Sequence, residues 1–421
     1  MERDGGMDAL PDGVVQHILS QLSSARDVAA CAGVSRTLRG CVPFLPTLYF
    51  PRGAFDAAGG GAAGAADEAI GRMVEAAARL EELVVYCPFS AARLPSWLAA
   101  RSASLRVLEL RIHSSGGGSE HLDSIAVVAN LEELRLWGLT MTRPPAWGQM
   151  ERLRLLEIVG AGLRDAVVNA AVGACPNLTD LALLGCEVSG SVAITLALLE
   201  RCRLDFVGSG NRSLALATPR LESLELQGIG WIALHGCNML KHLTIAENTG
   251  SVYSVHIEKI PDLEMLSLRG VQWSWGAVVS VLRCAREVRH LVMKVEFCGE
   301  FETLEPFPEV DLVDFFNRHP KLVKFEIHGA MFAALCQKNS LKNLDSKFSI
   351  PCLEEVLITV RSPLNAELKL QTLETLVKYS PRLRMMVIRV SQMKNCHDAA
   401  DGFFEEICKF MYVNNGRVRI E

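Results

Sequence analysis

A short aliphatic phrase recurs along most of the chain: an aliphatic residue, two variable residues, an aliphatic, one variable residue and a third aliphatic. Its clearest copies begin at Leu105, Leu131, Leu178, Leu221, Leu240 and Leu263, and looser copies extend the series from Leu80 to Leu383. Alternate side chains of a strand share a face, so the last two aliphatic positions of each copy predict one half-buried strand. A unit this short cannot bury its apolar face alone. The copies must therefore stack on one another.

The spacing of the copies is typical of a leucine-rich repeat, in which each unit supplies one strand and a return segment. Neighbouring copies are separated by 19 residues from position 221 to 240 and by 26 from 105 to 131. The stretches 163–172 and 277–285 place Ala, Val and Leu at helical spacing, which predicts helices on the outer side. We therefore expect an α/β fold with a horseshoe-shaped solenoid, whose concave strand face offers a large binding surface.

Composition excludes several classes of protein. The 421 residues contain no apolar run of the roughly 18 residues that a membrane span needs, and the start of the chain has no apolar signal segment. Thirteen cysteines without a Cys-x-x-Cys pair favour buried, reduced thiols in a cytosolic or nuclear protein. A net charge of −5 gives no reason to expect nucleic acid. We find no catalytic signature or metal-ligand pattern, and expect neither enzymatic activity nor a cofactor.

The first fifty residues precede the repeats and show a different pattern. Pro11 suits the first turn of a helix, and Val15, Ile18, Leu19 and Leu22 then fall on one helical face. Two further short helices are expected by about residue 40. Three helices of this size bury little apolar surface, so we expect this segment to dock against another surface.

This segment resembles an F-box. The resemblance rests on Leu10-Pro11, the run from Ile18 to Leu22, Arg26-Asp27-Val28 and Val34-Ser35-Arg36. Leu38 stands where F-boxes commonly carry a Trp. Farther along, the sequences at 80–86, 330–340 and 358–367 resemble the plant branch of F-box/leucine-rich-repeat proteins.

The resemblance implies four parts: an F-box over 1–50, a Gly/Ala-rich loop and capping helix over 51–79, the solenoid over 80–395 and a C-terminal cap over 396–421. It also implies a substrate receptor of a Skp1–cullin–F-box (SCF) ubiquitin ligase, which binds a Skp1-like adaptor and, through it, cullin and RING subunits. The receptor would hold an unidentified protein substrate for ubiquitination and proteasomal degradation, in the nucleus and/or cytoplasm. The alternative is a leucine-rich-repeat scaffold that acts outside any ligase.

Two sets of site residues follow. By resemblance, the residues expected to touch the adaptor are Leu10, Pro11, Ile18, Leu19, Leu22, Val28 and Val34; the alternative is that they form only the internal core of the helical bundle. The outward positions of the strands suggest a substrate surface with acidic and aromatic side chains, at Glu109, Glu133, Glu157, Tyr86 and Trp137. The alternative here is a solvated strand face without a partner.

Overall fold

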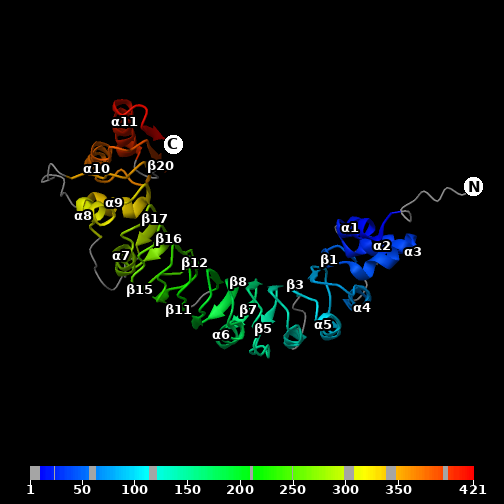
Figure 1. The fold of residues 1–421 in the computed structure, drawn as a ribbon. Helices are drawn as coiled ribbons and strands as arrows, with labels where there is room; N and C mark the ends of the chain where they lie inside the picture. Colours follow the sequence, from blue (N-terminus) through cyan, green and yellow to red (C-terminus); the bar gives the residue numbers. More distant parts are fainter. Residues whose placement is uncertain are drawn as a thin grey trace, which may run out of the picture. The chain divides into compact units, whose positions relative to one another are not determined.

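The computed structural model describes residues 10–22, 24–55, 63–112, 121–208, 212–248, 250–297, 308–337, 348–391 and 397–421. Two compact units make up the chain. The first comprises residues 1–199 and 203–207, and the second comprises residues 200–202 and 208–421. In both units helices pack on one side of a sheet of parallel strands (Figure 1). The fold is thus mixed α/β with a helical N-terminal region, as the sequence predicted.

The N-terminal region is a bundle of three short helices: α1 (Asp12–Ser20), α2 (Ala25–Val34) and α3 (Arg36–Cys41). Two serines define the helix starts, because Ser24 accepts a hydrogen bond from the amide of Asp27 and Ser35 accepts from the amides of Thr37 and Leu38. Such caps satisfy amides that have no partner within the helix. A single turn of 3-10 helix, η2 (Val42–Phe44), leads out of the bundle.

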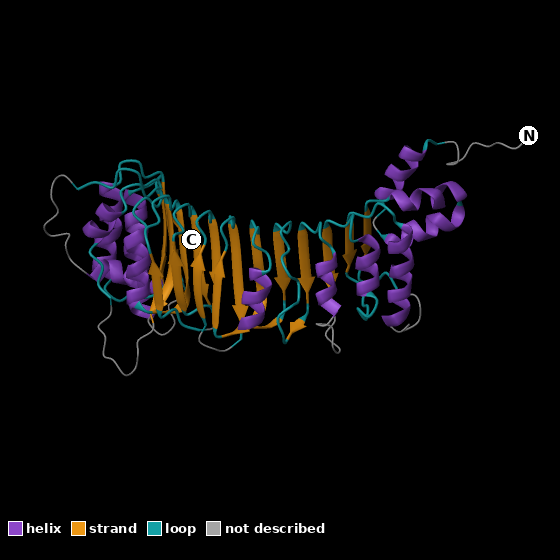
Figure 2. Ribbon diagram, turned by 60° about the horizontal axis from the view of Figure 1, so that its bottom comes forward, coloured by secondary structure: helices purple, strands orange, loops and turns teal. Residues whose placement is uncertain are grey.

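The sheet of the first unit joins successive strands in parallel. Its order is β1 (Thr47–Phe50), β2 (Glu82–Val85), β3 (Val107–Arg111), β4 (Glu133–Trp137), β6 (Leu155–Val159) and β8 (Asp180–Ser189). Strand β10 (Arg201–Val207) pairs with β8. The return segments contain α4 (Ala63–Ala76), α5 (Leu94–Arg101), η4 (His121–Val127), α6 (Asp165–Gly173) and the short strands β5 (Thr140–Met141), β7 (Gly162–Arg164) and β9 (Ser191–Thr195). Figure 2 shows helices on one side of the strands.

The register of these strands explains the aliphatic phrase. Leu108, Leu134, Leu156 and Leu181 are consecutive register partners across β3, β4, β6 and β8, and all four are buried. A second row, two residues farther along each strand, is equally buried. Removing a leucine side chain from water contributes about 1.5–3 kcal/mol, and each side chain packs on its neighbours in the next strands. Burial of both rows therefore depends on the strands keeping this register.

The second unit also joins successive strands in parallel, with short returns in its first part and longer ones toward the C-terminus. Its strands pair in parallel in the order β12 (Ser223–Gln227), β14 (His242–Glu247), β16 (Met265–Trp273), β17 (His290–Phe297), β18 (Lys324–His328), β19 (Glu355–Val360), β20 (Met385–Val390) and β21 (Val418–Ile420). Its helices are α7 (Trp275–Cys284), α8 (Leu312–Arg318), α9 (Gly329–Gln337), α10 (Ala366–Tyr379) and α11 (His397–Val413).

The outer side is not helical throughout. Helices α6 and α7 confirm the expectation for 163–172 and 277–285. Between them, within the second unit, the returns form β11 (Ser213–Ala217), β13 (Trp231–His235) and β15 (Ser254–Ile257), which pair in parallel as a small second sheet. The copies at 221, 240 and 263 are closely spaced, and extended backbone spans a short return with fewer residues than a helix.

The helical bundle is joined directly to the sheet. Strand β1 lies within residues 1–50 and pairs with β2, so the sheet begins before the predicted first repeat at 80. The amides of Glu81 and Glu82 donate to the carbonyl oxygen of Pro46 at 2.7 and 2.9 Å, and the guanidinium of Arg79 lies 5.2 Å from the centre of the Phe44 ring. The sequence contained the signal, since Leu45-x-x-Leu48-x-Phe50 is a copy of the phrase that ends in an aromatic residue.

The cysteines are mostly interior. All eleven cysteines of the described residues are free thiols, and seven of them are buried. Burial raises the pKa of Cys87 to about 11 and that of Cys175 to about 12, which keeps both as unreactive thiols at neutral pH. Within the same residues, no helix combines the length and apolar character that crossing a bilayer requires. The Gly/Ala-rich loop around residue 60 falls outside the described residues; α4 follows it.

Replacing Leu134 tests whether the aliphatic rows hold the first unit together. We expect Leu134→Ala to lower the free energy of unfolding by about 2–5 kcal/mol, because it opens a cavity between β3 and β6. Val127→Ala is the matched control, since Val127 lies in the return segment just before β4 with half of its surface exposed. Urea denaturation followed by circular dichroism measures both. Equal effects of the two substitutions would contradict the stacking argument.

Candidate functional site

The first candidate surface lies on the helical bundle. Of the seven residues predicted to touch an adaptor, Leu19 and Val28 are buried in the bundle core, and Ile18 and Leu22 are half-buried. Leu10 and Pro11 are exposed at the start of α1, and Val34 is 83% exposed at the end of α2. The seven therefore separate into a structural set and an accessible set.

Leu38 belongs to the structural set. It is 4% exposed and packs in the core cluster that also contains Val15, Leu19 and Val28. The residue that replaces the common Trp therefore contributes to the interior of the bundle. Its surroundings are apolar and shared by all three helices, so its loss would act first on bundle stability.

Sequence reasoning missed two accessible apolar side chains, Val14 and Phe44. They are 44% and 43% exposed. Val14 precedes Ile18 by four residues, so the two lie on one face of α1. That spacing could have identified Val14 beforehand. Phe44 follows the last helix and carried no periodic signal. Exposed aliphatic and aromatic side chains on so small a bundle make it a candidate docking surface.

The second candidate surface is the helix-free face of the strands in the first unit. Here Arg135 of β4 lies among three carboxylates of its own and the neighbouring strands. Its guanidinium nitrogens are 2.6 Å from Glu109, 2.8 Å from Glu133 and 4.0 Å from Glu157. The parallel register produces this arrangement, because Glu109, Arg135 and Glu157 are direct partners in β3, β4 and β6. The three predicted glutamates are thus brought together around one cation.

Aromatic side chains adjoin this ion-pair network. The hydroxyl of Tyr86 donates a hydrogen bond of 2.7 Å to Glu109. The ring of Tyr86 lies edge-on to Trp137 with centres 5.4 Å apart, and edge-on to Tyr49 at 5.7 Å. All five predicted substrate residues therefore belong to one connected cluster. Tyr49, on the earlier strand β1, was not predicted because that strand was not recognised.

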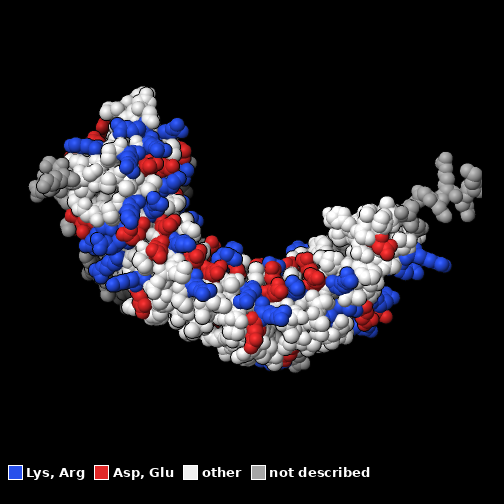
Figure 3. Space-filling view, in the orientation of Figure 1, with Lys and Arg blue, Asp and Glu red and all other residues white. Residues whose placement is uncertain are grey.

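The network changes the expected electrostatics of this face. Burial, followed by the hydrogen bond to Glu109 and the charge of that residue, raises the pKa of Tyr86 above its ordinary value. The phenol therefore stays neutral and keeps donating. Arg135 offsets part of the acidic charge, so the surface presents paired charges beside aromatic rings. Figure 3 shows acidic and basic side chains lying side by side over the strands.

The corresponding face of the second unit is also self-paired. Lys294 lies 2.6 Å from Glu326, Lys324 lies 2.7 Å from Glu355, and Arg389 lies 2.9 Å from Glu421. Each lysine or arginine uses a carboxylate on a neighbouring strand or at the chain end. Exposed pairs of this kind contribute little to stability but reduce the field that a partner meets.

The described residues contain no group of three or more His, Cys, Asp or Glu side chains that could hold a metal ion.

Comparison with known proteins identifies the kind of domain that the helical bundle forms. A family model described as F-box-like matches residues 7–45, which include all three helices. An F-box protein of Arabidopsis thaliana is 51% identical over 421 residues, a match that spans 99% of this chain and the whole length of that protein. The chain belongs to the plant F-box protein family.

Membership of the F-box family implies a general function for the chain. An F-box domain implies a substrate-receptor role in an SCF ubiquitin ligase and binding of a Skp1-like adaptor. F-box proteins are generally non-catalytic subunits, and neither comparison indicates a catalytic family. The matched segment of this F-box protein contains the exposed residues Leu10, Pro11, Val14, Val34 and Phe44.

The raised pKa of Tyr86 leads to a stability prediction at alkaline pH. Because the folded-state pKa lies above the unfolded one, the contribution of Tyr86 to stability is present below about pH 10 and is lost as the pH rises beyond it. We expect the Tyr86→Phe variant to lose less stability than the wild-type protein between pH 9 and 11 (about the range in which free tyrosine ionises). Thermal unfolding across this range measures it.

Tyr412→Phe is the control, because Tyr412 is 75% exposed. It should follow the wild-type pH dependence. If Tyr86→Phe also follows it, the phenol does not contribute to the network as described.

Proposed function

We propose that this F-box protein is the substrate-recognition subunit of an SCF ubiquitin ligase, with its parallel-strand units forming a leucine-rich-repeat solenoid. The exposed apolar set on the helical bundle would bind the Skp1-like adaptor, and through it cullin and RING subunits. The helix-free strand face would bind a protein substrate, leading to its ubiquitination and proteasomal degradation. The observation that carries this proposal is the exposure of Leu10, Val14, Val34 and Phe44 on a bundle whose core is already complete.

The bundle separates buried core residues from exposed apolar residues, and the exposed ones are available to an adaptor. A bundle core formed by Leu19, Val28 and Leu38 does not need Leu10 or Val34 for its own packing. Covering exposed apolar side chains with a partner removes them from water, which lowers the free energy of the system. Interfaces also tend to concentrate their binding energy in a few such residues. Among the seven predicted residues, the direct adaptor contacts are therefore proposed to be Leu10, Pro11 and Val34, with partial contributions from Ile18 and Leu22.

The substrate surface is argued from the cluster around Arg135. Tyr86 and Trp137 supply aromatic area, while Glu133 and Glu157 are more exposed than Glu109 and can accept hydrogen bonds from a partner. A substrate segment with a basic side chain between apolar ones would match these groups. Glu109 already bonds both Tyr86 and Arg135, so its proposed role is to position those two side chains.

Catalysis would come from proximity. Holding a substrate near a ubiquitin-charged enzyme raises its effective concentration without chemistry by the receptor. The backbone hydrogen bonds from Glu81 and Glu82 to Pro46 support this role, because they fix the bundle to the first strands of the substrate-binding unit. Free, largely buried thiols are compatible with a reducing compartment, so we further propose that the protein acts in the nucleus and/or cytoplasm.

Two variants test the adaptor surface. We expect the double substitution Leu10→Ala with Pro11→Ala, and separately Val34→Asp, each to weaken binding of a purified Skp1-like adaptor by about 2 kcal/mol or more, roughly 30-fold. The melting temperature should change little, because these side chains are exposed. Isothermal titration calorimetry with the full chain provides the affinity.

Val127→Asp is the control, since it introduces the same charge at an exposed aliphatic position outside the bundle. It should bind the adaptor like the wild type. If wild-type protein fails to bind any Skp1-like adaptor, the chain acts as a scaffold outside a ligase. If the variants bind the adaptor as tightly as the wild type does, the adaptor uses another face.

Charge reversal tests the substrate surface. We expect Glu133→Lys with Glu157→Lys to reduce capture of ubiquitinated proteins by about tenfold, because like charges would then surround Arg135. Glu68→Lys with Glu75→Lys is the matched control: it makes the same change in net charge at exposed positions of α4. Co-precipitation from proteasome-inhibited plant cells, with adaptor recovery as internal standard, measures both. Unchanged capture by the first pair would exclude this face.

A further inference from the structure

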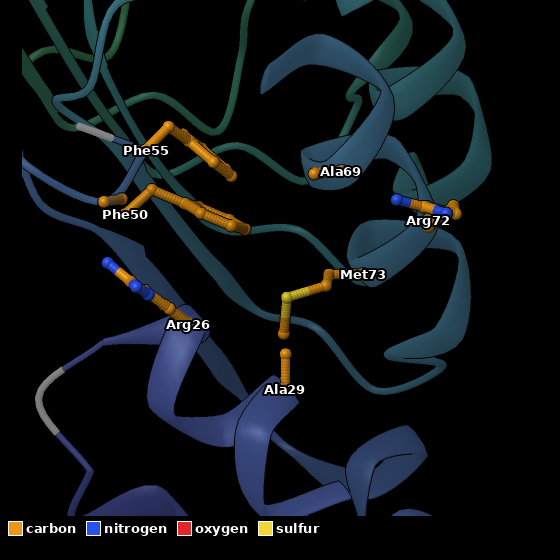
Figure 4. A pocket seen from close by; sticks show the side chains of 8 residues that line it. Arg26, Ala29, Phe50, Phe55, Ala69, Arg72 and Met73 are labelled. Carbon is orange, nitrogen blue, oxygen red and sulfur yellow. The ribbon is translucent and has the colours of Figure 1, made fainter. Parts of the chain in front are cut away.

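A cavity of about 470 Å³ lies where the helical bundle meets the first strand of the sheet. Its walls come from three elements: α2 supplies Ala29, β1 and the segment after it supply Phe50 and Phe55, and α4 supplies Met73. The two phenylalanine rings are stacked, with centres 6.4 Å apart and planes inclined by 17°. Figure 4 shows these rings facing Met73 across the cavity. The walls are thus apolar and partly aromatic.

Two arginines border this apolar cavity. Arg26 belongs to α2 and Arg72 to α4, and they stand on opposite sides of it in Figure 4. Both residues are exposed, and neither forms an ion pair or hydrogen bond with any residue that the structure describes. By contrast, Arg135 and Arg389 on the strand faces are each paired with a carboxylate. Among the described residues, the cavity therefore combines an apolar interior with two arginines at its edge that have no carboxylate partner.

We propose that this cavity binds a small amphipathic anion, a carboxylic acid with an apolar body. The body would lie against Phe50, Phe55 and Met73, and the carboxylate would reach a guanidinium at the edge, where Arg can bind it through two parallel hydrogen bonds. The volume lies within the range of about 300–1,000 Å³ that is usual for small-ligand sites. Neutral apolar ligands would leave both arginines unused, and highly charged ones would leave the aromatic walls without a partner.

Because of the position of the cavity, a bound ligand would affect the junction between the helical bundle and the first strands. Arg26 and Ala29 belong to the F-box bundle, whereas Phe50, Phe55 and Arg72 belong to the strand unit and its first helix. A bound molecule would contact both and add to the contact that Met73 already makes with the bundle core. It would stiffen the junction between the two binding surfaces. The site itself does not depend on the ligase role, so it can be tested separately.

Binding can be measured with 8-anilinonaphthalene-1-sulfonate, an aromatic anion whose fluorescence rises in apolar surroundings. We expect saturable binding to one site on the full chain, displaced by decanoate or by biphenyl-4-carboxylate. Decanol should bind about tenfold more weakly than decanoate, because it lacks the charge. Displacement by decanoate alone assigns an aliphatic acid, and displacement by the biphenyl acid indicates that an aromatic acid also fits. Binding that does not saturate, or equal affinity for decanol and decanoate, would overturn the proposal.

Two variants locate the site. Ala29→Trp should abolish probe binding by filling the cavity from α2, where Ala29 is exposed and the larger side chain leaves the bundle core intact. Arg26→Gln with Arg72→Gln should weaken it about tenfold. Arg93→Gln with Arg164→Gln removes the same charge from exposed positions elsewhere in the first unit and should bind like the wild type. Adaptor affinity confirms that each variant is folded; unchanged probe binding by Ala29→Trp would contradict the assignment.

Discussion

The parallel register of neighbouring strands is the constraint on which the other features of this molecule depend. It brings Leu108, Leu134, Leu156 and Leu181 into one buried row, and the same pairing continues within the second unit from Leu224 to Leu243 and Leu266. Because each residue is buried only by its neighbours, the strands of a unit support one another and the outer segments can vary in form. The outward positions are then fixed as well, which determines which charges and rings meet on the open face.

The helical bundle packs directly against the first elements of the sheet. Met73 of α4 packs on the bundle core, and Glu81 and Glu82 bond to Pro46 just before β1. The segment that resembles an F-box is therefore attached through a strand and a helix that also belong to the sheet unit. Its accessible apolar residues and the open strand face are parts of one packed body in the first unit, and the cavity bordered by Arg26 and Arg72 lies at their junction.

Much of this could be predicted from the sequence, because strand alternation links spacing directly to burial. The phrase predicted the strands, and the helices at 163–172 and 277–285 followed from periodicity. Other features depend on three-dimensional neighbours. Periodicity placed Ile18 and Leu19 on the same side of α1, yet only packing against α2 and α3 shows that Leu19 enters the core and Ile18 remains half-buried. Similarly, the charges at Glu109, Glu133 and Glu157 were visible, but the reach of Arg135 to all three depends on register and side-chain conformation. Strand β1 could have been recognised from Leu45, Leu48 and Phe50 if aromatic residues had been allowed at the last position.

If the strand face binds a substrate as proposed, the pairing of Arg135 with three carboxylates would affect how quickly and how selectively this face exchanges partners. Opposite charges held within a few ångströms cancel at a distance, so an approaching molecule experiences weak long-range attraction and meets the surface at an ordinary diffusional rate. Once in contact, it must offer groups that replace or extend the existing hydrogen bonds, or else leave partly buried charges without partners. Discrimination by the proposed substrate surface would then reside in the lifetime of the complex: mismatched molecules would leave quickly, and a matched one would stay.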